Sequence, residues 1–150
     1  MQTVRTAQRV VKAPAQEIFE LLATPERHSE FDGSGSVQGT ASGPQRLGLG
    51  DEFGMRMRKG APYTTRNTVV EFEEGRRIAW RTATKVGDRL LFGGQVWRYE
   101  LTDRGDGTTL VKESFDLSNA RPAAALDALA GGSAQKGMIS TLENLARHFG

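Results

Sequence analysis

The sequence has no cysteine among its 150 residues, which excludes disulfides, thiolate nucleophiles and thiolate metal sites. It also has no apolar run long enough to span a bilayer, so we expect no stable membrane insertion. The first residues alternate polar and apolar side chains where a signal peptide would have a continuous apolar stretch. From these absences we expect a cytoplasmic protein.

Motifs for nucleophilic, nucleotide and metal chemistry are missing too. There is no Gly-x-Ser-x-Gly elbow, and the pieces GSGSVQG and GLGDEFG fit neither the dinucleotide nor the P-loop pattern. Of the 2 histidines, His148 falls in the last turn of a predicted helix, where it complements the helix dipole. His28 has acidic neighbours, but not at the spacing of metal ligands. We therefore predict no metal and no cofactor.

An excess of charge of one sign is also absent, because 20 Lys and Arg nearly balance 18 Asp and Glu to give +2. Six basic residues share the predicted outer face of a sheet: Arg56, Arg58, Arg66, Arg81, Arg98 and Lys112. No aromatic platform accompanies them, so we expect no nucleic-acid partner. We interpret them as a solvated face that Glu52, Glu100 and Asp116 partly neutralise.

The patterns that are present indicate one domain over residues 1–150. Thr3–Lys12 alternates like a strand, and two short helices begin at Pro14 and at Thr24–Pro25. Six further strands are predicted at Ser36–Ala41, Asp51–Arg58, Tyr63–Phe72, Arg77–Thr84, Leu91–Leu101 and Thr108–Leu117. Turns are predicted at Gly48–Gly50, Glu74–Gly75, Gly87–Asp88 and Gly105–Gly107, and such short connections favour an antiparallel meander.

Residues 119–150 return to helical spacing, with a kink or break predicted near Gly131–Gly132 and Gly137. The fold class is therefore α+β, with a curved antiparallel sheet against a C-terminal helix. One sheet face is rich in methionine and aromatic residues. This face either packs as an ordinary core or lines a cavity, and hydrophobicity alone does not separate these two alternatives.

Polar residues on the apolar face narrow the choice. Glu113 stands between Val111 and Phe115, where a buried carboxylate is costly unless it is paired or protonated. An ion pair with an arginine at the sheet rim is the interpretation that we favour over ligand contact. Gln95 shares the phase of Trp97, and a slip in the pattern over residues 69–72 predicts a bulge that leaves the facing of nearby residues open.

The order of these elements resembles the helix-grip fold of the START-like (SRPBCC) superfamily. The likeness is carried by APAQEIFELLATPERHSEF, LGLGDEFGMRM, NTVVEFEEGRRIAWR and MISTLENLARHF, and it is strongest to the polyketide cyclase/dehydrase-like branch. The resemblance implies a seven-stranded curved antiparallel sheet wrapped around a long C-terminal helix, with two short helices after the first strand. It also implies a deep apolar pocket between sheet and helix.

Carried onto this sequence, the resemblance places at that pocket Phe31, Phe53, Met55, Met57, Tyr63, Asn67, Trp80, Trp97, Tyr99, Glu113, Phe115, Met138 and Leu142. The segment 26–31 would lie near the mouth, with His28 and Phe31 as gates. The local pattern, by contrast, places His28 on an exposed helix face.

Three functions follow as hypotheses. The first is a carrier or binding protein for a hydrophobic small molecule that is lipid-like, isoprenoid or an aromatic polyketide, working as a monomer or homodimer. The second is a cyclase/dehydratase-type enzyme, for which the available acid and base groups are Glu113, Tyr99, Tyr63 and His28. The third is a protein-interaction module that uses the basic outer face.

Overall fold

A computed structural model describes residues 3–86, 89–120 and 122–150. The strands form one 7-stranded antiparallel sheet in the order β1-β7-β6-β5-β4-β3-β2. They are β1 (Val4–Val11), β2 (Val37–Ser42), β3 (Glu52–Lys59), β4 (Ala61–Glu73), β5 (Arg77–Val86), β6 (Arg89–Asp103) and β7 (Thr109–Asp116). The helices are α1 (Ala15–Leu22), the 3-10 helix η1 (Pro25–Glu30), α2 (Ala123–Leu126), the π-helical turn η2 (Asp127–Gly131) and α3 (Gly132–His148).

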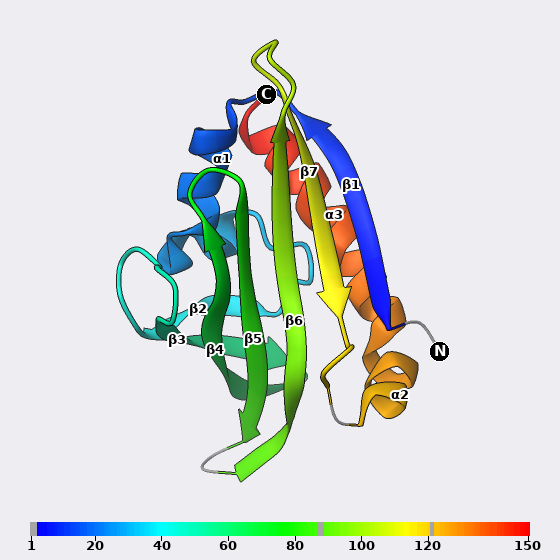
Figure 1. The fold of residues 1–150 in the computed structure, drawn as a ribbon. Coiled ribbons are helices and arrows are strands. Elements are labelled where there is room, and N and C mark those ends of the chain that lie inside the picture. Colours follow the sequence, from blue (N-terminus) through cyan, green and yellow to red (C-terminus); the bar gives the residue numbers. More distant parts are fainter. Residues whose placement is uncertain (1–2, 87–88, 121) are drawn as a thin grey trace.

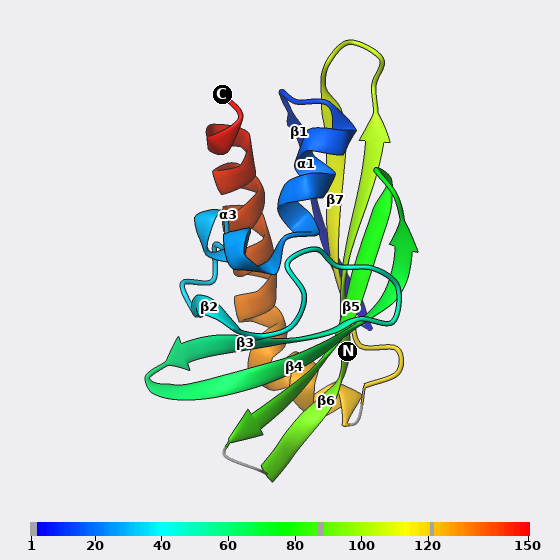
Figure 2. The same cartoon turned by 90° about the vertical axis from the view of Figure 1, so that its left-hand side faces the viewer.

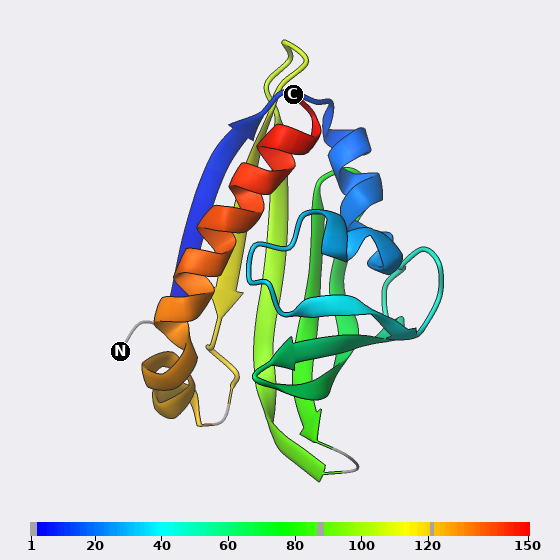
Figure 3. The same ribbon diagram turned by 180° about the vertical axis from the view of Figure 1, so that it is seen from behind.

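The sheet curves strongly, and the C-terminal helix runs along its concave side (Figure 1, Figure 3). In Figure 2 the hairpin of β3 and β4 projects at a steep angle to β7, and α1 lies beside the C-terminal end of α3. The predicted α+β helix-grip arrangement is confirmed, including the two short helices after the first strand. Among the described residues no helix is long and apolar enough to cross a membrane.

The strand bounds differ from the prediction by a few residues, and the predicted bulge is present. The register of β4 against β5 shifts between Val69 and Glu71. Beyond this bulge, the alternation of inward-facing and outward-facing side chains along β4 is reversed. The turn predicted at Gly87–Asp88 lies outside the described residues. The second short helix begins with Pro25 as expected, but the Thr24 hydroxyl donates back to the carbonyl of Glu20 at 2.7 Å and makes no cap hydrogen bond.

The C-terminal helix, for which a kink or break is predicted near Gly131–Gly132, is not broken but contains the π-helical turn η2 at this place. The backbone stays helical through Gly131 and Gly132, with a π-helical turn in place of a break, and the helix begins at Ala123 rather than near residue 119. A Cβ on Gly131 would lie 2.6 Å from Arg5 Nε, which itself is 2.9 Å from Asp127 Oδ1. A side chain at this position would have to displace the Arg5–Asp127 ion pair, so the glycine makes room for this contact with β1 and does not end the helix.

A second close glycine contact attaches the loop after η1 to α3. The Gly33 amide donates to Thr141 Oγ1 at 2.9 Å, and a Cβ at this position would lie 2.5 Å from the side chain of Ser140. The Asn144 side-chain amide donates to the carbonyl of Phe31 at 3.1 Å. These contacts hold one side of the cavity described below against the helix.

Candidate functional site

The apolar interior is divided into two clusters. The larger cluster packs α1, the upper sheet and the end of α3, and it includes Ile18, Phe19, Leu22, Ile78 and Leu145. The smaller cluster, at the other end of the helix, consists of Phe115, Leu117, Ala120, Leu126 and Met138. A cavity of about 560 Å³ is lined by residues of both clusters. The apolar sheet face is therefore partly core and partly cavity wall.

All but one of the side chains that the resemblance placed at a pocket line this cavity. They are Phe31, Phe53, Met55, Met57, Tyr63, Asn67, Trp80, Trp97, Tyr99, Glu113, Phe115 and Met138. Leu142 belongs to the larger apolar cluster instead, where it is 2 % exposed. The helical side of the cavity is formed by small residues, among them Ala130, Ser133, Ala134 and Gly137, which leave the space open.

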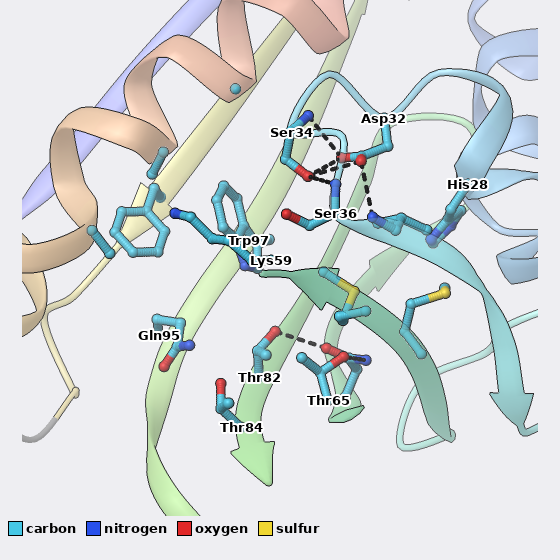
Figure 4. A pocket seen from close by; sticks show the side chains of 18 of the residues that line it. His28, Asp32, Ser34, Ser36, Lys59, Thr65, Thr82, Thr84, Gln95 and Trp97 are labelled. Carbon is cyan, nitrogen blue, oxygen red and sulfur yellow. Dashed lines mark hydrogen bonds between the residues drawn. The ribbon is translucent and has the colours of Figure 1, made fainter. Parts of the chain in front are cut away.

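Further polar side chains line the same cavity, and of these Gln95 alone was singled out from the sequence, by its phase with Trp97. They are Asp32, Ser34, Ser36, Lys59, Thr65, Thr82, Thr84, Gln95 and Thr141, most of which Figure 4 labels. The threonines could have been found, because Thr65 has the phase of Asn67 and Thr82 and Thr84 have that of Trp80. Lys59 and Thr141 depend on the curvature of the sheet and the rotation of α3, which no local pattern reports.

His28 is not exposed, as the local pattern predicted, but 6 % exposed within the cavity wall. Its ring stacks on Trp80 with centroids 5.2 Å apart and meets the edges of Phe31 and Phe53. Its Nε2 lies 2.8 Å from the carbonyl oxygen of Leu22. Burial lowers the pKa of His28 to about 4 although that hydrogen bond opposes the shift. A neutral imidazole therefore donates to Leu22 at the end of α1, and its stacking on Trp80 packs η1 against the sheet.

Glu113 does not form the ion pair at the sheet rim that we favoured from the sequence. It is 4 % exposed inside the cavity, opposite Tyr99 on the neighbouring strand. The Tyr99 hydroxyl hydrogen-bonds its carboxyl group, and Oε1 has no hydrogen-bond partner among the described residues. Burial raises the pKa of Glu113 to about 8, and the charge of Asp32 adds to the shift. The group is therefore a neutral carboxylic acid at pH 7.

Arg98, which directly precedes Tyr99 in the sequence, forms its ion pairs on the opposite, outer face of the sheet. Arg98 Nη2 lies 2.6 Å from Glu71 Oε2, and its Nη1 lies 3.1 Å from Asp116 Oδ2. Arg77 pairs with Glu100 on the same outer face. The expected neutralisation of the basic face by Glu100 and Asp116 is thus present, and these pairs explain why Arg98 was not available to Glu113.

Asn67 faces inward and stabilises the sheet by hydrogen bonds. Its amide nitrogen donates to Phe53 O at 3.3 Å and to Thr65 Oγ1 at 3.1 Å, while Thr82 donates to its oxygen at 2.8 Å. Because the bulge follows at Val69, the facing of Asn67 keeps the phase of the first half of β4. Its polar atoms are satisfied within the protein.

The loop of residues 32–37 forms a polar edge of the cavity (Figure 4). Asp32 accepts hydrogen bonds from the Ser34 amide and hydroxyl and from the Val37 amide. Tyr63 hydrogen-bonds Ser36, and partial burial raises the pKa of its hydroxyl. The site as a whole offers an apolar volume with a few polar groups, the arrangement of a small-molecule pocket.

Comparison with known proteins agrees with this geometry. The sequence matches the family described as polyketide cyclase / dehydrase and lipid transport over residues 1–150. The chain belongs to this family. Protein Rv0088 of Mycobacterium tuberculosis is 35% identical over 107 residues, which are 71% of this chain but only 44% of that protein. The chain thus matches less than half the length of this relative.

Solved structures of low sequence identity share the family's fold. Protein Ms6760 from Mycobacterium smegmatis has a TM-score of 0.76 at 15% identity, covering 97% of this chain and 90% of its own. The major latex-like protein 151 of Panax ginseng has a TM-score of 0.71 at 15% identity, covering 97% and 96%. DynU16, a protein of the dynemicin biosynthetic locus, has a TM-score of 0.68 at 18% identity over 99% of this chain and 47% of its own.

Proposed function

We propose that the protein binds a hydrophobic small molecule in the cavity between sheet and α3, as a carrier or binding protein. The single observation that supports this most is the cavity of about 560 Å³, which divides the apolar interior and is lined by methionine and aromatic side chains. A volume of this size is within the range of small-molecule sites. Methionine adapts to irregular ligand shapes, and aromatic rings provide large apolar contact areas.

The protein contains its own reporter for such a ligand. Both tryptophans, Trp80 and Trp97, line the cavity, and they lie on neighbouring strands where they pair directly. A ligand that occupies the cavity must contact or displace water from at least one indole ring. Intrinsic fluorescence therefore reports binding without a label.

The test is a titration of the protein with N-phenyl-naphthylamine, an uncharged apolar probe, followed by tryptophan quenching. Ala134→Phe on α3 fills the cavity from its helical side, and we expect it to weaken the probe by about tenfold or more, as loss of buried contact area implies. Ile139→Phe is the matched control, because Ile139 is 46% exposed on the same helix. We expect this control to bind like the wild type.

Equal binding by Ala134→Phe and the wild type would show that the probe lies elsewhere and would contradict the proposal. Thermal unfolding of both variants shows whether α3 stays folded. Native mass spectrometry of protein from its own host then identifies a ligand that remains bound through purification.

The second candidate function is a cyclase/dehydratase-type enzyme, and Glu113 is the observation that supports it. A neutral carboxyl group next to Tyr99 in an apolar cavity is able to donate a proton to a carbonyl oxygen or to a departing hydroxyl group. The discriminating measurement is turnover of a β-hydroxyketone to its enone. Turnover by the wild type and none by Glu113→Gln supports the enzyme, whereas binding without turnover supports the carrier.

A further inference from the structure

Two buried polar atoms in the cavity wall have no hydrogen-bond partner among the described residues. They are Gln95 Oε1 and Glu113 Oε1, on side chains that are 7% and 4% exposed. Buried polar atoms are nearly always hydrogen-bonded, because leaving one unpaired costs the full loss of its hydration. The two atoms therefore indicate where a ligand supplies hydrogen bonds.

These two atoms belong to opposite ends of one strip of the sheet. Glu113 pairs with Tyr99, and Gln95 lies on the same strand as Tyr99 and pairs with Thr82. Gln95 and Tyr99 are four positions apart on an extended strand, so the two groups stand roughly 13 Å apart along the sheet. Between them Trp97 packs on Phe115 with ring centroids 4.6 Å apart. The strip is thus polar at each end and aromatic in the middle.

We infer that the ligand is an uncharged, elongated ring system with an oxygen function at each end, a hydroxyl at Gln95 and a hydroxyl or carbonyl at Glu113. This inference rests on the proposed function, because it concerns the occupant of the same cavity. A plain acyl chain does not fit this description, because its methylene groups would form no hydrogen bond with Gln95 or Glu113.

At Gln95 the hydroxyl follows from the chemistry of the amide. The amide offers an acceptor oxygen and a donor nitrogen, and a hydroxyl group pairs with either. Thr82 and Thr84 line the cavity beside it, and Figure 4 shows Gln95, Thr82 and Thr84 in the same part of the cavity. A methyl group at this place would leave the Gln95 oxygen unpaired.

At Glu113 an oxygen acceptor is required. The ionisable groups that line the cavity are Glu113, Tyr99, Asp32, Tyr63, His28 and Lys59. Tyr99 already donates to one carboxyl oxygen, and burial keeps the group protonated at pH 7, so the acid proton is free to donate. A carboxylate ligand is disfavoured here, because it would be buried near the charge of Asp32. Lys59, the cationic residue of the set, is an exposed side chain at the end of β3.

The experiment measures displacement of N-phenyl-naphthylamine by four competitors at pH 7. They are estradiol, its two analogues that each lack one hydroxyl group, and palmitate. We expect each missing hydroxyl to weaken binding by about ten- to a hundredfold, although the analogue is the more hydrophobic molecule. We expect palmitate to bind more weakly than estradiol.

Two variants assign each hydroxyl to its partner. In Gln95→Leu one of the two analogues should bind as tightly as estradiol, and in Glu113→Leu the other should do so. Gln8→Leu, at an exposed position of β1, is the matched control and should keep the full preference for estradiol. Combining each ligand analogue with each protein variant distinguishes the loss of one hydrogen bond from a general change in the polarity of the cavity.

The outcomes distinguish this inference from the proposed function. If the probe binds but estradiol fails to displace it, or if the analogues or palmitate bind as tightly as estradiol, the inference is wrong and the carrier function stands. Absence of probe binding at the cavity overturns both. A preference for estradiol that persists equally in Gln95→Leu and Glu113→Leu also overturns it, because the hydroxyl groups would then pair elsewhere.

Discussion

The difference in free energy of unfolding between Glu113→Gln and the wild type is expected to shift in favour of the variant between pH 4.5 and pH 8. Burial raises the pKa of the folded carboxyl to about 8 from 4.5. Between these values the folded state holds a proton that the unfolded state releases, so the stability of the wild type falls as the pH rises through this window. With about 1.4 kcal/mol for each pH unit, the loss that glutamine avoids is on the order of 4 kcal/mol.

Urea denaturation of the wild type and the variant at the two ends of the window measures this difference. Below pH 4.5 both carry a neutral side chain in both states, and their stabilities should then differ little. Glu52→Gln is the control, because Glu52 is exposed on β3 and water solvates it in the folded state as well. A Glu113→Gln effect that stays constant between these two pH values would mean that the pKa of the folded carboxyl is not raised and that the group is ionised in the fold.

A buried acid that costs stability is typical of a site rather than of a core. Gln95 and Glu113 each keep a polar atom unpaired in the cavity wall, whereas Asn67 on the same face pairs within the protein. Residues that serve only packing have no reason to bear this cost, and proteins commonly trade stability for function at such places. Pairing of the polar atoms within the protein therefore separates structural from functional polar residues on this sheet: the polar atoms of Asn67 are paired, and one of Glu113 is not.

Most of the fold could be predicted from local patterns. Period-two strands, the proline-opened helices and the glycine turns depend on neighbouring residues, and the structure follows them. Near Gly131, where a kink or break is predicted, the helix contains a π-helical turn and continues, and this glycine lies against the side chain of Arg5, which is distant in sequence. A local pattern shows that glycine is needed, but it does not show which neighbour requires it.

Local patterns predicted which side chains of the candidate site face inward, but they did not predict that an open cavity lies in front of these side chains. Alternation correctly placed Trp80, Tyr99 and Glu113 on the inner face. It could not show that the space before them is open, which depends on the curvature of the sheet and on small helix residues such as Ala134 and Gly137. His28 was assigned to the surface because its neighbours in sequence are polar, although the 3-10 geometry of η1 turns its ring onto Trp80.

The second large effect of pH on the free energy of unfolding comes from His28. It lowers stability as the pH falls, whereas the effect of Glu113 lowers stability as the pH rises. Burial lowers the pKa of its ring from 6.5 to about 4, so the unfolded chain takes up a proton in this window and the folded protein does not. The contribution of His28 to stability is therefore full above pH 6.5 and is lost as the pH falls toward 4, by about 3 kcal/mol. His28→Gln removes the titrating group and should remove this loss. His148→Gln, at the exposed end of α3, should retain it.

The measurement compares each variant with the wild type by urea denaturation at pH 6.5 and at pH 4. The window of His28 overlaps that of Glu113, and the two slopes oppose each other between pH 4.5 and 6.5, so the wild-type profile alone does not resolve either group. The difference between His28→Gln and the wild type does, because Glu113 contributes equally to both. Glutamine loses the stacking on Trp80 at every pH, which is a constant offset. The change in that difference between the two pH values tests the burial of His28, and a change near zero would place its ring in water.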